Sequence, residues 1–202
     1  MKANFERANE RTGGHEGLYA NNRNDRGGET YAGVARKYWP YSAIWSIIDG
    51  IKQIHCQGID LGNYKNWKFV NVHAKGNAKL KELVTEFYRK NFWDTARLGL
   101  FESQALANNV YDFGVNGGVV RAAMFLQKAY NKLKKAGAVA LKEDGQIGAK
   151  TVAAVEDLGV RLVYDEYNRL REAHYRSEAK KPGQAEFLNT WLSRIIPFKD
   201  AA

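Results

Sequence analysis

The chain has 202 residues, of which 45% are hydrophobic and 26% are charged. This composition is typical of a globular protein that folds in water, and the length is enough to bury a core in one domain or in two small lobes. The 31 basic and 22 acidic residues leave a net charge of +9, which would attract a polyanion such as nucleic acid, anionic lipid or an anionic cell-wall polymer.

The N-terminal segment and the cysteine content exclude several further classes. Residues 1–7 contain no apolar segment of signal-peptide length, and no stretch approaches the roughly 20 apolar residues of a spanning helix. We therefore expect synthesis in the cytoplasm, no stable membrane insertion, and release by another factor if the substrate lies at the cell wall or in the periplasm. Cys56 is the only cysteine, which excludes an internal disulfide and a thiolate zinc cluster.

Helical periodicity dominates the chain. Apolar residues recur at spacings of three and four, which is the pattern of amphipathic helices. This pattern predicts helices at 44–51, 80–93, 119–135, 159–178 and 188–195. Strand signals are short, at 69–72 and 139–141, and the segment 58–76 lacks helical periodicity, so that a loop or small hairpin is predicted there. The predicted fold class is all-α, with at most a small β hairpin.

The densest group of chemically active side chains lies in residues 15–31, where glycines permit tight turns. Glycoside hydrolysis needs a carboxylic acid that protonates the leaving oxygen and usually a second group that readies a water. Glu16 and Asp25 are candidates for these roles, and Thr30 offers a hydroxyl that orients a water together with Asp25. Burial beside an aromatic ring such as Tyr19 would favour the protonated acid. The alternative interpretation is a surface loop rich in Gly and Asn.

The order of these groups is that of the Glu-Asp-Thr arrangement of phage-type lysozymes. More specifically, the chain resembles the family 108 glycoside hydrolases, muramidases of phage endolysins and bacterial secretion activators, in the motif Glu16-Gly17-x-Tyr19, Asp25-x-Gly27-Gly28-x-Thr30 and Gly33. The resemblance implies that Glu16 is catalytic and that a lysozyme-like helical fold with two closely packed lobes cleaves the β-1,4 bond between N-acetylmuramic acid and N-acetylglucosamine. Leu18 and Tyr31 depart from the family pattern, which has a second glycine at the position of Leu18.

The resemblance continues in the second half of the chain, through Tyr111-Asp112-Phe113-Gly114-Val115-Asn116-Gly117-Gly118 and Asp144-Gly145-x-Ile147-Gly148-x-x-Thr151. It implies a catalytic region at 1–97 and a helical peptidoglycan-binding region at 98–202. Asp112 and Asn116 are four residues apart, which would put them on one face if this segment is helical, and they either bind glycan or cap the turn at Gly117-Gly118. The candidates for substrate binding are Tyr19, Asn22, Tyr31, Asp112 and Asn116.

Other chemistries fit the sequence less well. The segment His15-Glu16-x-x-Tyr19 lacks the second histidine of the zinc-protease motif, so no metal or cofactor is expected. The expected partner is bacterial peptidoglycan. A lytic transglycosylase, which needs one glutamate and no bound water, and a non-catalytic peptidoglycan-binding protein used in secretion or interaction remain as alternatives. A nucleic-acid partner is not expected, because the basic residues are dispersed and no groove-reading motif is present.

Overall fold

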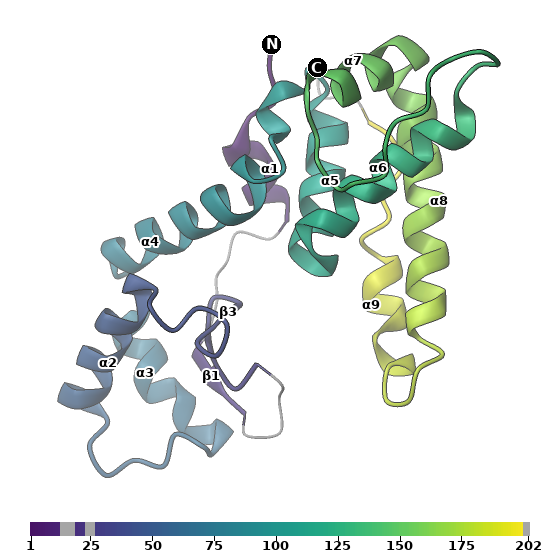
Figure 1. The fold of residues 1–202 in the computed structure, drawn as a ribbon. Coiled ribbons are helices and arrows are strands. Elements are labelled where there is room, and N and C mark those ends of the chain that lie inside the picture. The colour runs from purple at the N-terminus through teal and green to yellow at the C-terminus, as the bar shows by residue number, and fades with distance from the viewer. Residues whose placement is uncertain (13–18, 23–26, 200–202) are drawn as a thin grey trace. The chain divides into compact units, whose positions relative to one another are not determined.

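A computed structural model of the chain describes residues 1–12, 19–22 and 27–199, which divide into two compact units (Figure 1). One unit comprises Met1–Thr12 and Arg89–Ala202, and the other comprises Gly13–Tyr88. Helices make up most of the described residues, and the sheet is small. The fold is therefore mainly α and lysozyme-like, as predicted. The catalytic and binding regions assigned to 1–97 and 98–202 stay predictions.

The unit of residues 13–88 combines the small sheet with helices that supply its core. Its elements are β1 (Tyr19–Asn21), β2 (Glu29–Tyr31), β3 (Val34–Ala35), α2 (Ala43–His55), the 3-10 helix η1 (Tyr64–Asn66), α3 (Trp67–Ala74) and α4 (Ala78–Tyr88). Helix α2 begins at a capping serine, Ser42, whose side chain accepts a bond from Ile44 N. Its apolar face is buried through Ile44 and Ile48, together with Val70 of α3 and Leu80 of α4.

The three strands form an antiparallel sheet in the order β1-β2-β3. Ala32 and Gly33 connect β2 to β3 with positive φ angles of 50° and 75°. Such left-handed backbone in both residues suits a two-residue hairpin, because its twist matches that of the strands. Tyr88, at the end of α4, donates a hydrogen bond of 2.9 Å from its hydroxyl to the carbonyl oxygen of Ala32. Burial raises the pKa of Tyr88 to about 12. Helix α4 is thus bonded to the turn between β2 and β3.

The other unit is built around a nearly fully buried helix, α5 (Gln104–Gly117). Helix α5 begins at Ser103, whose hydroxyl accepts a bond from Leu106 N, and it ends at Gly118, where a φ of 96° breaks the chain direction. Helices α1, α6 and α8 contact α5, and α6 and α8 run beside it in Figure 1. The elements around α5 are α1 (Phe5–Arg11), the π-helical turn η2 (Arg89–Asp94), the 3-10 helix η3 (Leu98–Leu100), α6 (Val119–Leu133), α7 (Ala149–Leu158), α8 (Val160–Glu178), the 3-10 helix η4 (Ala185–Phe187) and α9 (Leu188–Leu192).

The periodic segments predicted as helices are found as α2, α4 continuing into η2, α6, α8 and α9. Neither of the two short strand signals forms a strand: residues 69–72 lie in α3, and residues 139–141 lie in no helix or strand. The loop or hairpin predicted for 58–76 contains η1 and α3. The strands lie instead at 19–35, where glycine and asparagine obscure the alternation of a strand. Helix α5 was not predicted as an element, because polar residues such as Asn108 and Asn109 lie within its buried surface and interrupt the apolar pattern.

Replacing Gly33 with alanine tests how tightly α4 holds the β2–β3 turn. A Cβ atom at Gly33 would lie 2.6 Å from the Tyr88 hydroxyl, whereas Gly58, with a similar φ of 72°, has nothing within 4 Å. We expect Gly58→Ala to cost about 1 kcal/mol from backbone strain. Gly33→Ala should cost roughly 1–3 kcal/mol more, because the buried ring must move. Urea unfolding measures both, and equal losses would contradict the contact.

Candidate functional site

The predicted site residues divide between the two units. Glu16 and Asp25 lie outside the described residues. Thr30 lies on β2, next to Tyr31, and the β1–β2 pair brings both close to Tyr19, while Asn22 follows β1 and is exposed. The remaining two candidates, Asp112 and Asn116, lie on α5 in the other unit. The sheet therefore brings together four of the candidates from the N-terminal motif.

The register of the sheet places Thr30 on its less buried face. Thr30 pairs with Ala20 of β1 and with Ala35 of β3, and all three are half-buried. Side chains alternate between the two faces along a strand, so the neighbouring pair Tyr19 and Tyr31 points to the other, buried face. Because its neighbours across the strands are alanines, the Thr30 hydroxyl stands among small side chains. Such a surface has room for a water or a sugar hydroxyl.

The edge of β1 is completed by a side chain of α3. The backbone nitrogen of Tyr19 donates to Asn71 Oδ1 at 2.6 Å, and Asn71 Nδ2 donates back to the Tyr19 carbonyl at 3.4 Å. The amide of Asn71 thus takes the place of a further strand at Tyr19 and satisfies backbone groups that would otherwise be left unpaired. Sequence reasoning missed Asn71, since its partner lies 52 residues away.

A cluster of charged groups surrounds Glu29, whose side chain is only 15% exposed. One carboxylate oxygen of Glu29 accepts bonds of 2.8 Å from the Tyr19 hydroxyl and from Lys52 Nζ. The other oxygen lies 2.7 Å from Arg36 Nε. Arg36 also donates to both oxygens of Asp49, at 2.9 and 2.6 Å, and Lys52 approaches Asp49 to 2.8 Å. The cluster joins all three strands to α2, because Arg36 directly follows β3.

The electrostatics of this cluster indicate a supporting role. The hydrogen bond from Arg36 lowers the pKa of Asp49. Burial, together with the bond to the Glu29 carboxylate, raises the pKa of Tyr19 far above its ordinary value. One oxygen of Glu29 accepts hydrogen bonds from Tyr19 and Lys52, and the other is ion-paired with Arg36, which suits the anchoring of the strands better than proton donation to a substrate. Tyr19 is fully buried, and its predicted contact with substrate stays a prediction.

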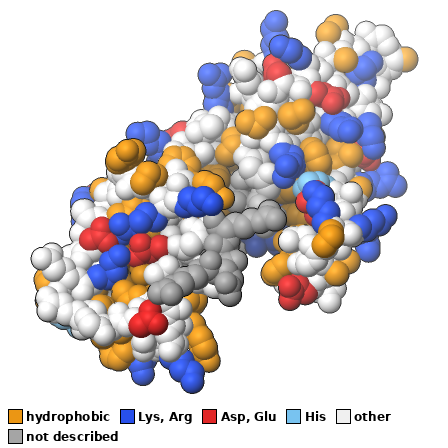
Figure 2. Space-filling view, turned by 60° about the horizontal axis from the view of Figure 1, so that its bottom comes forward, with side chains coloured by type: hydrophobic (Ala, Val, Ile, Leu, Met, Phe, Trp, Pro, Cys, Tyr) orange, Lys and Arg blue, Asp and Glu red, His pale blue; other side chains and the backbone are white. Residues whose placement is uncertain are grey.

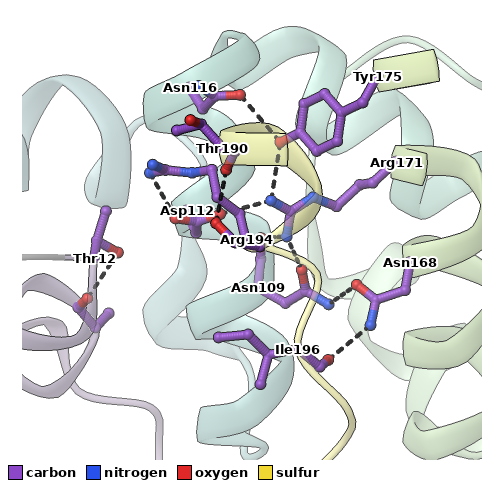
Figure 3. A network of polar contacts seen from close by, with 12 residues as sticks. Thr12, Asn109, Asp112, Asn116, Asn168, Arg171, Tyr175, Thr190, Arg194 and Ile196 are labelled. Carbon is purple, nitrogen blue, oxygen red and sulfur yellow. Dashed lines mark hydrogen bonds and ion pairs between the residues drawn. The ribbon is translucent and has the colours of Figure 1, made fainter. Parts of the chain in front are cut away.

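Asp112 and Asn116 belong to a polar network that joins α5 to α8 and to the segment after α9 (Figure 3). The Asp112 carboxylate lies 2.6 Å from Arg171 Nη2 and 2.8 Å from Arg194 Nη2. Arg171 Nη2 also donates to the Tyr175 hydroxyl at 3.0 Å, and this hydroxyl donates to Asn116 Oδ1 at 3.0 Å. Both predicted binding residues therefore have internal partners.

Arg171 is the centre of this network and is fully buried. Burying a guanidinium is costly unless it is paired and hydrogen-bonded, and Asp112 and Asn109 supply those partners. Asn109 in turn donates to Asn168 at 2.9 Å. Sequence reasoning missed Arg171, although its spacing of four residues from Tyr167 and from Tyr175 puts a charge on the buried stripe of α8. A charged residue on an apolar stripe was the sequence signal that could have identified Arg171.

The surface gives no sign of one concentrated basic patch on the face that Figure 2 shows. Lys and Arg side chains are scattered there, with acidic side chains between them. Within the part of the chain that the structure describes, no helix combines the length and the apolar character needed to cross a membrane.

The fold is helical and lysozyme-like, and comparison with known proteins assigns the class of protein, a glycoside hydrolase. The family model described as Glycosyl hydrolase 108 matches residues 10–118, which is more than half of the chain. The protein belongs to this family. A solved structure of SagA from Brucella abortus is similar, with a TM-score of 0.58 and 24% sequence identity over 95% of this chain and 88% of that chain. At this identity the likeness supports the fold alone. No curated protein matches the sequence.

Tyr19→Phe tests the link between β1 and Glu29. We expect a loss of roughly 1 kcal/mol at neutral pH, because one buried hydrogen bond is removed. The pKa of Tyr19 is raised in the folded state, so its contribution to stability is present below the unfolded value of about 10 and is lost as pH rises through the folded pKa. The variant should therefore lose less stability than the wild type above pH of about 10.

Chemical unfolding between neutral and alkaline pH measures this difference. Tyr64→Phe is the matched control, since Tyr64 belongs to the same unit and is 68% exposed. A residual alkaline slope should remain in Tyr19→Phe, because burial also raises the pKa of Tyr31 and of Tyr88. An alkaline slope unchanged from the wild type would contradict the assignment.

Proposed function

We propose that the protein is a lysozyme-type muramidase that hydrolyses the β-1,4 bond between N-acetylmuramic acid and N-acetylglucosamine in peptidoglycan. The observation that carries this proposal is the family match over residues 10–118, which includes Glu16, Asp25 and Thr30. The half-buried position of Thr30, on the less buried face of the sheet, adds support, because a water held there needs an accessible hydroxyl beside it.

In the proposed reaction Glu16 is the general acid. It gives its proton to the glycosidic oxygen as the bond from that oxygen to the anomeric carbon breaks. A water positioned by Asp25 and Thr30 attacks the anomeric carbon, and the proton that the water loses goes to Asp25. The products are a new hydroxyl on the leaving sugar and a reducing end on the other. This course inverts the anomeric carbon, and Asp25 acting as nucleophile would retain it.

The scaffold supports this reaction by fixing β1 and β2, the strands that precede and follow Asp25 in the sequence. Tyr19 on β1 and Glu29 on β2 pair through their side chains, while Asn71 holds the outer edge of β1. Strand β2, which carries Thr30, pairs with β1 on one side and with β3 on the other, so the side chain of Thr30 is held on one face of the sheet. Positioning of this kind is what holding a water for attack requires.

We also propose that the protein acts at the cell wall or in the periplasm after release by another factor, and that residues 98–202 bind peptidoglycan. The net charge of +9 supports an anionic wall polymer as the target. The polar and basic helices of this part of the chain offer hydrogen-bond donors for a glycan or for its peptides.

Glu16→Gln tests the acid. Glutamine keeps the size of the side chain but cannot donate the proton, so clearing of purified sacculi should fall by roughly 10²–10⁴-fold while thermal unfolding stays unchanged. Glu10→Gln, an exposed change of the same kind on α1, is the control. Mass spectrometry of the wild-type products should show reducing ends. Products with 1,6-anhydromuramic ends would instead establish a lytic transglycosylase, and full activity in Glu16→Gln would refute the assignment.

Thr30→Val and Thr30→Ser together test whether the Thr30 hydroxyl positions the attacking water. Valine keeps the branched shape that suits a strand but removes the hydroxyl, and serine keeps the hydroxyl. We expect kcat to fall roughly tenfold or more in Thr30→Val with little change in KM, and to stay near the wild-type value in Thr30→Ser. Steady-state hydrolysis of soluble glycan fragments separates kcat from KM. Equal rates for the two variants would exclude the hydroxyl from the reaction.

A further inference from the structure

A cavity of about 180 Å³ lies beside the Arg171 network, in the unit that contains α5. Its walls come from the end of α1, from α5 and α8, and from the segment after α9. The residues that decide its chemistry are Arg11, Asn108, Asp112, Arg171, Arg194 and Ile196. Figure 3 shows Asp112, Arg171, Arg194 and Ile196 of this wall.

The lining of the cavity is positively charged. Three arginines and one aspartate face it, so that two positive charges are left over among the lining residues. Arg171 is fully buried and shares Asp112 with Arg194. An excess of positive charge in a partly enclosed cavity attracts an anion, because little water is available to screen it.

The arginines also have hydrogen-bond donors to spare. A guanidinium has five N–H donors, and Arg194 uses one of them within the described part of the chain, from Nη2 to Asp112. The buried Nε atoms of Arg194 and of Arg171 have no acceptor there. Arg11, exposed at the end of α1, makes no ion pair with any residue that the structure describes. An anionic ligand would satisfy donors that the protein leaves open.

The other residues of the cavity wall limit which chemical groups can be attached to the anion. Ala105 and Tyr164 are buried apolar surfaces of the cavity, and Ile196 is partly exposed. The Asn108 side chain accepts a bond from Gln104 through its oxygen, which leaves its amide nitrogen for a ligand. The volume lies below the roughly 300–1,000 Å³ of pockets for drug-sized ligands, so the ligand or its bound end is small.

We propose that this cavity binds the free carboxylate at the end of a peptide, with a small apolar side chain next to it. Arg11 and Arg194 hold the carboxylate, Asn108 donates to the preceding carbonyl, and Ala105 and Ile196 contact the side chain. Asp112 in the wall disfavours a dianion such as phosphate more than a monoanion. On the muramidase function proposed above, on which the identity of the peptide rests, the ligand is the terminal D-alanine of a peptidoglycan stem peptide.

Binding is tested on the full chain with diacetyl-L-lysyl-D-alanyl-D-alanine, which has no glycosidic bond, by calorimetry or by NMR titration. The peptide with an amidated terminus and inorganic phosphate are the comparison ligands. We expect the peptide with a free carboxylate to bind and the amidated peptide to bind at least roughly tenfold more weakly. Inorganic phosphate should not compete with the peptide. Binding of acid and amide alike, binding of phosphate alone, or no binding would each overturn the proposal.

Arg11→Gln and Arg194→Gln should each lower the affinity for the peptide with a free carboxylate roughly tenfold or more. Arg11→Gln removes no ion pair within the described chain, and thermal unfolding of the variant checks that it is folded. Arg7→Gln is the control, because it removes the same charge from an exposed position of α1 outside the cavity. An equal loss of binding in Arg7→Gln would mean attraction by net charge and would overturn the site.

The outcome is independent of hydrolysis. A protein that fails to clear sacculi but distinguishes the acid from the amide would keep the binding site and lose the muramidase proposal. A protein that clears sacculi but does not bind the peptide would lose the binding site alone.

Discussion

The negative charge of the largely buried Glu29 carboxylate needs positively charged partners, and the ion pairs that supply them hold the small sheet in place. Strands of two or three residues form few backbone bonds, and so short a sheet is marginal by itself. Glu29 of β2 binds Arg36, which follows β3, Lys52 of α2 and Tyr19 of β1. Its side chain therefore links all three strands to α2. Thr30 follows Glu29 directly, and its orientation is set by the same contacts.

The same constraint organises the other unit. Arg171 is buried, and a buried charge needs partners that are held in place. These partners come from α5, through Asn109 and Asp112, and Asp112 also binds Arg194 near the end of the chain. One guanidinium therefore connects helices that are distant in sequence. The surplus of positive charge that remains around it is what makes the adjoining cavity suited to an anion.

Membership of the glycosyl hydrolase 108 family and the geometry of the sheet supply different parts of the functional argument. The family assigns the class of reaction. The sheet shows how the described strands next to the motif are held, since Asn71 bonds to the outer edge of β1 and the Glu29 carboxylate of β2 accepts a hydrogen bond from the Tyr19 hydroxyl of β1. Residues that the motif does not contain, among them Arg36, thus have a part in positioning those that it does.

The sequence by itself determined the helices with one apolar face, such as α2, α6 and α8, because their periodicity is local. It also pointed to the motif around Glu16 and to the reaction class. Tertiary structure alone decided that residues 69–72, which include Phe69, Val70 and Val72, join a helix, while the strands form among glycines and asparagines. It also decided the partners of Asp112. The physical reason is that strand pairing and the compensation of buried charge depend on groups far apart in the chain, which no local pattern records.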